Sequence, residues 1–426
     1  MFPWSSNARS YSQRVPVSFV RGTGAFLFDA QGADYLDFLT GAGASILGHA
    51  HPAVVDAIRN FDVGFFSHLD LVTDVERDFA EQLLPLLPFT SPDDIRLHFC
   101  APTGSDAVEA ALKLARIVTG RSSVWAFTGS YHGGTQGALS VTSSKRLRTL
   151  GLHGQHDVVF FPFPAPSVFP SPFASEEEAL GLSTFLLNLA LLDDHSGVGK
   201  PAAIIIEPVQ GEGGVHVAPI RFMSFLRDFC NRNDIVLICD EIQSGFGRTG
   251  NWFACKYSQI EPDILCLSKG MGGGLPVALI AYREKLNTWP SGTHIGTFRG
   301  PSLSLVCGTA IIKAAQETKV LQNVNKVGPQ LQRRLSILKN EFPIIRSIRG
   351  IGLFIGVEFF AERSDLPTQI SKHLFENRII AETVGRNNMT LKLLPPLNLN
   401  TKEVEEFCIR FERVLKTITY SCSRSR

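Results

Sequence analysis

The sequence predicts an α/β fold with a mostly parallel β-sheet, and three short apolar runs carry this prediction. They are AAIIIEPVQGEGG, IVLICDEIQSGFGRTG and DILCLSKGMGGGLP, all between Ala202 and Pro276. Short β-branched runs bounded by Gly and Pro, with helical segments between them, are typical of buried parallel strands. The runs end at Glu207, Asp240 and Lys269. Because ligands bind beyond the carboxyl ends of such strands, we expect two acids and a lysine to meet in one crevice, a combination that a cofactor would explain.

Length and composition indicate an ordered globular protein. A chain of 426 residues can form two domains, and 44% hydrophobic with 19% charged residues fits a folded chain. The 41 basic and 40 acidic residues, a net charge of +1, give no electrostatic case for nucleic acid or an anionic membrane as partner. The N-terminus shows no apolar signal segment, and the apolar piece from Phe185 to Leu192 is too short to span a bilayer. The eight cysteines form no CxxC pair, so we expect free thiols and a cytoplasmic protein.

The N-terminal part predicts a small meander of antiparallel strands from Arg14 to Leu39, where short apolar runs alternate with Gly and Asp. A helix is expected from Pro52, since proline is favoured in the first turn. His49 and His51 precede this helix and could bind a metal. No third ligand lies nearby in the sequence, so we expect them to serve as polar groups of the turn, and we expect no metal site.

A possible phosphate site follows the predicted strand IRLHFC, which comes after a helix expected over 73–84. In APTGSDAVEAALKLARIVTG, Thr103, Gly104 and Ser105 end the strand and open a helix of apolar spacing, with Ser105 as the expected N-cap. Free amides and hydroxyls at a helix N-terminus can bind phosphate. An ordinary capped helix is the alternative.

The stretch SVWAFTGSYHGGTQGALS has the same organisation of strand, turn and helix, with Tyr131 and His132 in the turn. An aromatic side chain at a strand end could stack on a flat cofactor ring, and the alternative is a residue that fills the core. For His132 two roles stay open, support of a cofactor or capping of the helix.

The rest of the chain predicts further helices and a second, smaller domain. Helices are expected over 176–192, 302–317 and 321–340 and from Thr401 onward. The strands expected are VALIAYRE, RSIRGIGLFIGVEF, RIIAETV and MTLKLL. The part after about Val320 has a βαβ-like pattern and is interpreted as the smaller domain.

Seven motifs in a fixed order resemble those of class III aminotransferases, which are pyridoxal-phosphate (PLP) enzymes of fold type I. They are LGHAHP, TGSDAVEAALKLAR, SYHGG, EPVQGEGG, DEIQSGFGRTG, LSKGMGGGLP and GTFRG, and the resemblance covers Arg14 to Leu415. It implies a large domain with a mostly parallel seven-stranded sheet and a smaller α+β domain built from both termini. The implied division is 1–55 and 320–426 for the small domain and 56–319 for the large one.

Further details are similar to the branch of 2,4-diaminobutyrate:2-oxoglutarate aminotransferases, namely NTWPSGTHIGTFRG, HLDLVT and the SYHG-x-T-x-GALS pattern. This likeness implies reversible transfer of the terminal amino group between L-2,4-diaminobutyrate, or a similar ω-amino acid, and 2-oxoglutarate, giving aspartate 4-semialdehyde and glutamate. Another ω-aminotransferase, of the ornithine or lysine type, and an aminomutase or racemase remain alternatives. A binding module without catalysis is the third class, against which the intact Lys269, Asp240 and Tyr131 argue.

The resemblance also implies roles for residues around the cofactor. Lys269 would bond PLP and later move a proton, and Asp240 would face the pyridine nitrogen and keep it protonated. Gln243 would donate to the phenolic oxygen of the cofactor, and Tyr131 would stack on its ring. Glu207 would lie close to Asp240 and Gln243.

The phosphate and the substrate are assigned in the same way. Gly104 and Ser105 would bind the phosphate, and Thr297 of the neighbouring subunit would complete that site, which implies a homodimer with shared active sites. Glu212 matches a glutamate that pairs with an arginine in many ω-aminotransferases, but the position of that arginine is Lys392 here. Lysine cannot form the two-pronged contact of arginine with a carboxylate. Gly134 stands where 4-aminobutyrate aminotransferase has an arginine, which argues against that substrate.

Overall fold

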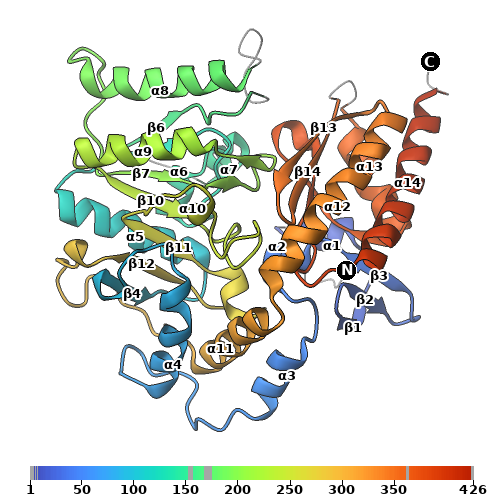
Figure 1. Cartoon of the computed structure of the whole chain (residues 1–426), viewed down its shortest axis with the longest axis horizontal. Helices are drawn as coiled ribbons and strands as arrows, with labels where there is room; N and C mark the ends of the chain where they lie inside the picture. Colours follow the sequence, from blue (N-terminus) through green and yellow to red (C-terminus); the bar gives the residue numbers. More distant parts are fainter. Residues whose placement is uncertain are drawn as a thin grey trace.

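The computed structural model describes residues 4, 6, 8–151, 157–166, 175–360 and 364–423. The largest element is a seven-stranded sheet in the order β4-β12-β11-β10-β7-β5-β6 (Figure 1). Pairing is parallel from β11 through β10, β7 and β5 to β6, whereas β12 runs antiparallel to β11 and β4. The mostly parallel sheet expected from the sequence is therefore confirmed. The strands are β4 (Ile95–Phe99), β5 (Val124–Phe127), β6 (Val158–Phe161), β7 (Ala203–Ile206), β10 (Val236–Asp240), β11 (Ile264–Leu267) and β12 (Leu279–Arg283).

Helices cover both faces of this sheet because neighbouring side chains of a strand point to opposite faces. On β10, Ile238 belongs to the apolar cluster that includes the buried face of α5 (Gly104–Thr119). Leu237 belongs to the cluster that includes α8 (Glu176–Leu192) and α9 (Ile220–Arg232). Figure 1 shows α8 and α9 on one side of the strands and α5 on the other.

Further helices surround this core. α11 (Ser302–Glu317) packs against α4 (Asp74–Leu83) and α3 (Pro52–Arg59), so residues far apart in the sequence form one helical layer below the sheet in Figure 1. The shorter helices are α2 (Thr40–Gly43), α6 (Gln136–Val141), α7 (Lys145–Gly151) and α10 (Ala254–Tyr257).

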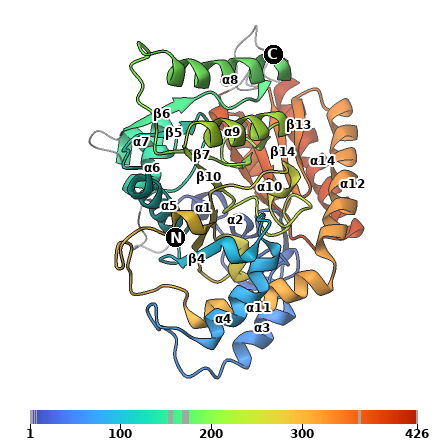
Figure 2. The ribbon, with the colours of Figure 1, turned by 60° about the vertical axis from the view of Figure 1, so that its left-hand side comes forward.

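The two ends of the chain build a second part that lies beside the large sheet (Figures 1 and 2). One sheet has the order β1-β2-β3-β15, in which the C-terminal β15 pairs in parallel with the N-terminal β3. Another has the order β13-β14-β17-β16. The helices α12 (Val320–Glu341), α13 (Leu366–Glu376) and α14 (Thr401–Ser423) cover these sheets, and α1 (Tyr11–Arg14) lies near the start of the chain. The strands are β1 (Phe19–Thr23), β2 (Phe26–Asp29), β3 (Asp34–Asp37), β13 (Ile345–Ile351), β14 (Phe354–Phe359), β15 (Ile379–Ile380), β16 (Glu382–Val384) and β17 (Thr390–Leu393).

The βαβ-like interpretation of the C-terminal part is wrong, because β13, β14, β17 and β16 pair antiparallel throughout. The chain reverses between β13 and β14 at Gly352, which has φ +59°. A Cβ there would lie 2.6 Å from the carbonyl oxygen of Arg248, so the tight turn needs glycine at this position. The stretch RSIRGIGLFIGVEF, expected to be strand, thus forms a hairpin of β13 and β14.

Within the described part of the chain, no helix has both the length and the apolar character needed to cross a bilayer.

Candidate active site

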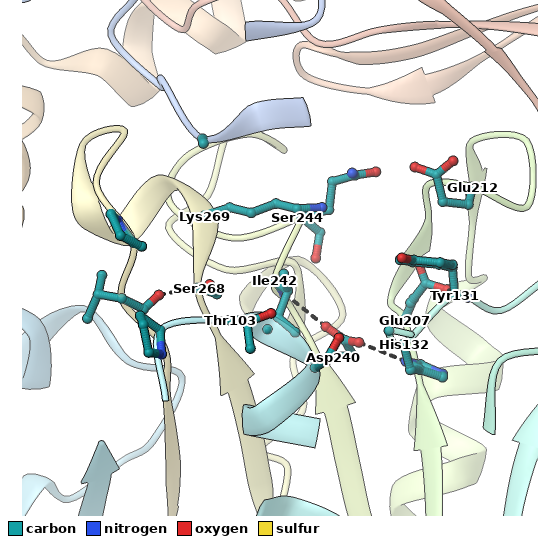
Figure 3. A pocket seen from close by; sticks show the side chains of 18 of the residues that line it. Thr103, Tyr131, His132, Glu207, Glu212, Asp240, Ile242, Ser244, Ser268 and Lys269 are labelled. Carbon is teal, nitrogen blue, oxygen red and sulfur yellow. Dashed lines mark hydrogen bonds and ion pairs between the residues drawn. The ribbon is translucent and has the colours of Figure 1, made fainter. Parts of the chain in front are cut away.

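A cavity of about 360 Å³ opens at the carboxyl ends of β7, β10 and β11 (Figure 3). This is the edge at which the three apolar runs of the sequence end. All the residues singled out for the site line it, except Thr297 and Lys392. The residues brought together are Gly104, Ser105, Tyr131, His132, Glu207, Glu212, Asp240, Gln243 and Lys269.

Lys269 follows β11 and begins the short 3-10 helix η4 (Lys269–Gly272), and its side chain extends across the cavity in Figure 3. Its φ of +46° lies in the left-handed region that non-glycine residues rarely adopt. Strained backbone of this kind persists where the surrounding structure holds it, often at functional sites. Burial, and then the charge of Lys392, lower the pKa of the Lys269 amine, against the opposing effect of nearby carboxylates. A larger fraction of this amine is therefore neutral than of an exposed lysine.

Asp240 ends β10 and has a partner for each carboxylate oxygen. Its Oδ2 lies 2.7 Å from Nδ1 of His132, and its Oδ1 accepts a hydrogen bond from the Ile242 amide at 3.0 Å. The His132 side chain is fully buried, and its Nε2 has no hydrogen-bond partner among the described residues. His132 therefore lies at the cavity and orients Asp240.

The N-terminus of α5 faces the cavity through Gly104 and Ser105. The prediction that Ser105 is the N-cap is wrong, because α5 begins at Gly104 and the N-cap is Thr103, which has extended backbone angles. As the second helical residue, Ser105 instead accepts a hydrogen bond from the Gly134 amide at 3.2 Å. A Cβ on Gly133 would lie 2.2 Å from Ser105 Oγ, so glycine keeps this corner open. Helix amides, a hydroxyl and glycines form a cradle that suits a phosphate group.

Glu207 is buried just beyond the end of β7 and supports the loop that carries Tyr131. Its two oxygens accept hydrogen bonds from the amides of Tyr131 at 2.9 Å and Gly211 at 3.1 Å. Burial raises the pKa of Glu207 to about 7, and the negative charge of Asp240 adds to the effect while His132 opposes it. Tyr131, held by this contact, lies at the cavity with 39% of its surface exposed, and a flat ligand could stack on it.

Lys392, on β17, is fully buried behind the cavity and carries two ion pairs. Its Nζ contacts Glu212, and it lies 2.9 Å from Oε1 of Glu382 on β16. Burial would lower the pKa of Lys392, but the two glutamates outweigh burial and raise it, so the amine is charged. The role of Glu382 was not predicted from the sequence. The feature that could have identified Glu382 is the pairing of β16 with β17, because Glu382 lies directly opposite Lys392 in that ladder.

Thr297 lies outside the cavity of its own chain, on an exposed loop where its carbonyl oxygen accepts a hydrogen bond from Ser67 Oγ at 3.2 Å. Its neighbours Ile295 and Phe298 are 75% and 63% exposed. Gln243 does line the cavity, and its Nε2 lies 3.4 Å from the carbonyl oxygen of Ala42.

The two histidines before α3 serve the local structure. Nε2 of His49 lies 2.7 Å from Oδ2 of Asp37, and His51 accepts a hydrogen bond from the Ala53 amide as the N-cap of α3.

The fold and the cavity fit a PLP-dependent enzyme of fold type I: the cradle at α5 suits the phosphate, the Asp240 carboxylate suits a protonated ring nitrogen, and Lys269 supplies an amine. The chain belongs to the class III aminotransferase family, whose model matches residues 7–415, and PLP is therefore its cofactor. A crystal structure of an amine transaminase from an uncultivated Pseudomonas species, in its PLP-bound form, superposes with a TM-score of 0.85 at 26% identity and covers 98% of both chains.

Other relatives agree with this assignment. The diaminobutyrate–2-oxoglutarate aminotransferase of Haemophilus influenzae is 38% identical over 422 residues, which are 96% of this chain and 92% of that protein. The enzyme of the same name from Rhizobium meliloti is 38% identical over 94% of this chain and 88% of its own length. The ornithine aminotransferase of Toxoplasma gondii, at 24% identity and a TM-score of 0.82 over 98% of this chain and 94% of its own, shows the shared fold.

Proposed function

We propose that the chain transfers the terminal amino group of L-2,4-diaminobutyrate to 2-oxoglutarate, reversibly, giving aspartate 4-semialdehyde and glutamate. Transamination follows from the family. The choice of donor is supported by the names of relatives that are 38% identical over nearly the whole chain. Gly134 adds support, because it stands where an arginine would favour 4-aminobutyrate.

The cofactor would be held by residues at four points of the cavity. Gly104 and Ser105 would bind its phosphate, Asp240 its ring nitrogen and Tyr131 one face of its ring, with Gln243 near its phenolic oxygen. When bound, PLP supplies an electron sink for the charge left at carbon after a proton is removed. Asp240, oriented by His132, would keep a proton on the ring nitrogen, where the electron sink needs it.

Lys269 would carry the proton that transamination has to move. Its amine must be neutral to take a proton from the carbon next to the substrate nitrogen, and the lowered pKa favours that state. Glu207 would hold the Tyr131 loop through its two backbone contacts. The Glu212–Lys392 pair would meet the end of the substrate that does not react.

We also propose a homodimer in which Thr297 of each chain completes the phosphate site of its partner. The exposed side chains of Ile295 and Phe298 beside Thr297 support this, because burial against a second copy would stabilise them. The division of the chain at residues 55 and 319 and a cytoplasmic location remain predictions, which limited proteolysis and cell fractionation test.

A panel of amino donors tests the proposed reaction. The PLP-loaded protein is incubated with 2-oxoglutarate and each of L-2,4-diaminobutyrate, L-ornithine, L-lysine and 4-aminobutyrate, and glutamate is measured. We expect the highest kcat/KM with diaminobutyrate. Glutamate formed faster from ornithine or lysine would contradict the choice of donor. A product formed from the donor without any 2-oxo acid would instead indicate an isomerase.

A further inference from the structure

The loop of residues 287–301, which carries Thr297, is exposed at its tip and fixed at its base. Residues 295–298 at the tip are exposed, whereas Arg299 at the base is only 6% exposed. The guanidinium of Arg299 donates to the carbonyl oxygen of His294 and thereby closes the loop below the tip. The exposed tip therefore stands on a buried, closed base.

Arg299 also ties this base to the large sheet. Its Nη1 lies 3.3 Å from Nε2 of His98 on β4. An arginine can only donate, so this histidine nitrogen is the acceptor and the ring is neutral. Burial, and then the charge of Arg299, lower the pKa of His98 to about 4, which keeps the ring neutral at pH 7. The charge of Arg299 also opposes a metal ion at His98, His294 and Cys100, whose ligand atoms lie within 4.8 Å of one another.

His294 ties the base of the loop to the first turn of α5. Its Nε2 lies 3.1 Å from Oδ2 of Asp106, and the same oxygen accepts a hydrogen bond from the Ala101 amide at 2.7 Å. Burial would raise the pKa of Asp106, but the contact with His294 and the Ala101 amide outweigh burial and lower it, so the carboxylate is charged. Farther along α5, Lys113 Nζ donates to the carbonyl oxygen of Thr293 at 3.2 Å. Two side chains of α5 therefore hold the loop.

The first turn of α5 thus serves two places. Gly104 and Ser105, its first residues, face the cavity of their own chain, where they suit a phosphate group. Asp106, the next residue, holds the loop whose Thr297 lies outside that cavity. In the proposed homodimer this loop would complete the phosphate site of the partner. One helical turn would then fix a phosphate contact in each of the two sites.

We propose that Asp106 and His294, together with Arg299, position Thr297 for the phosphate site of the partner, so that a substitution in one chain weakens PLP binding in the other. The inference rests on the proposed homodimer and names the residues that hold its shared loop in place. A hydroxyl contributes to binding only when it is held at the position of the ligand, and the exposed tip depends on its base for that. Asp106, His294 and Arg299 act through Thr297 and are positioning residues.

PLP affinity, measured from the cofactor absorbance of diluted holoenzyme, tests the proposal. His294→Ala removes the donor to Asp106 but keeps the backbone carbonyl that Arg299 binds. Its homodimer should bind PLP about tenfold more weakly, the order expected when a hydrogen bond to a charged group is lost. His294→Gln places an amide N–H near the position of Nε2 and should restore most of the affinity. The control His195→Ala changes a side chain that is 90% exposed and should leave the affinity unchanged.

Two heterodimers, isolated with different affinity tags, show in which site His294 acts. In each, only one site keeps Lys269, and borohydride reduction measures the PLP bound to that lysine. When Lys269→Ala is paired with His294→Ala, the unaltered loop completes the site of the intact lysine, and PLP binding should match the parent. When one chain carries both substitutions and the other neither, the altered loop completes that site, and binding should be as weak as in the His294→Ala homodimer. The reverse pattern, or equal binding in both heterodimers, would overturn the proposal.

Asp106→Ala removes the other side of the same contact and gives a second, independent variant. Placed on the chain that lacks Lys269, it should weaken PLP binding at the intact lysine of the other chain as His294→Ala does. Unchanged binding there would show that α5 does not hold the loop. This variant decides the question if His294→Ala forms no dimer.

The same heterodimers with Thr297→Ala separate the inference from the proposed dimer. A monomeric parent, or a Thr297→Ala substitution that weakens only the site of its own chain, would overturn the proposed shared site. If Thr297→Ala acts across the interface while His294→Ala and Asp106→Ala leave PLP binding unchanged, the shared site stands and the positioning by α5 is wrong.

Discussion

Lys392→Met should destabilise the protein by about 3–4 kcal/mol at pH 7. The substitution keeps the buried length of the side chain but removes the cation from Glu382, which is 6% exposed. Breaking a buried ion pair by removing one partner costs roughly 3–5 kcal/mol. Protonation limits the loss, since a glutamic acid with a normal pKa of about 4.3 becomes neutral at a cost of about 3.7 kcal/mol at pH 7. Glu212 adds little, because its side chain is partly exposed and can turn to water.

A double-mutant cycle measures this energy. Urea unfolding followed by circular dichroism is compared for the parent, Lys392→Met, Glu382→Gln and the double variant. The double variant should regain most of the lost stability, with a coupling of at least about 2 kcal/mol. The exposed Lys402→Met on α14 serves as control and should change stability by less than about 0.5 kcal/mol. If Lys392→Met lowers the free energy of unfolding by less than about 1 kcal/mol, or by the same amount with and without Glu382→Gln, the Lys392–Glu382 ion pair does not stabilise the fold as described.

Three further predictions concern the cavity and its completion. Asp240→Asn places an amide against His132 Nδ1, and this amide cannot keep a proton on the ring nitrogen of the cofactor. We expect kcat to fall by about 10²–10⁴ while PLP stays bound, as measured by the absorbance of the cofactor. An unchanged kcat would remove the role of Asp240. Burial raises the pKa of Glu207 to about 7, so its neutral form contributes stability that is full below pH ~4 and is lost as the pH rises through 7. Glu207→Gln should therefore flatten the pH profile of the unfolding free energy between pH 5 and 8, and parallel profiles would contradict the raised pKa. Mixing Lys269→Ala with Thr297→Ala subunits tests sharing across the interface, since mixed dimers then hold one site with both defects and one with neither. Activity should reappear on mixing, and none should reappear if Thr297 serves its own chain.

The sequence predicted the part of the site that lies at the strand ends. Glu207, Asp240 and Lys269 each follow a short β-branched run, and parallel strands bring their carboxyl ends to one edge, so order along the chain was enough to bring them together. The buried apolar runs also predicted the mostly parallel sheet, whereas its seven strands were implied by the resemblance. The cap of α5 was misassigned because the choice between Thr103 and Ser105 depends on the backbone angles of one residue.

The remaining features depend on long-range pairing that spacing does not determine. Glu382 and Lys392 meet because β16 and β17 pair antiparallel in one register, and a shift by one residue would have placed them on opposite faces. The same uncertainty led to the βαβ-like interpretation of the part after about Val320, whose strands β13, β14, β17 and β16 pair antiparallel. Thr297 lies outside the cavity of its own chain, and its proposed role in the site of a partner came from the resemblance, not from the residue pattern.

Borohydride reduction of the PLP-loaded protein tests whether Lys269 carries PLP for transamination. Reduction fixes the bond between lysine and cofactor, and peptide mass mapping then locates the pyridoxyl group. The structure predicts one label per chain, on Lys269, and its loss, together with glutamate formation, in Lys269→Ala. A label on Lys392, or a Lys269→Ala protein that turns over at the rate of the parent, would show that Lys269 does not carry the cofactor.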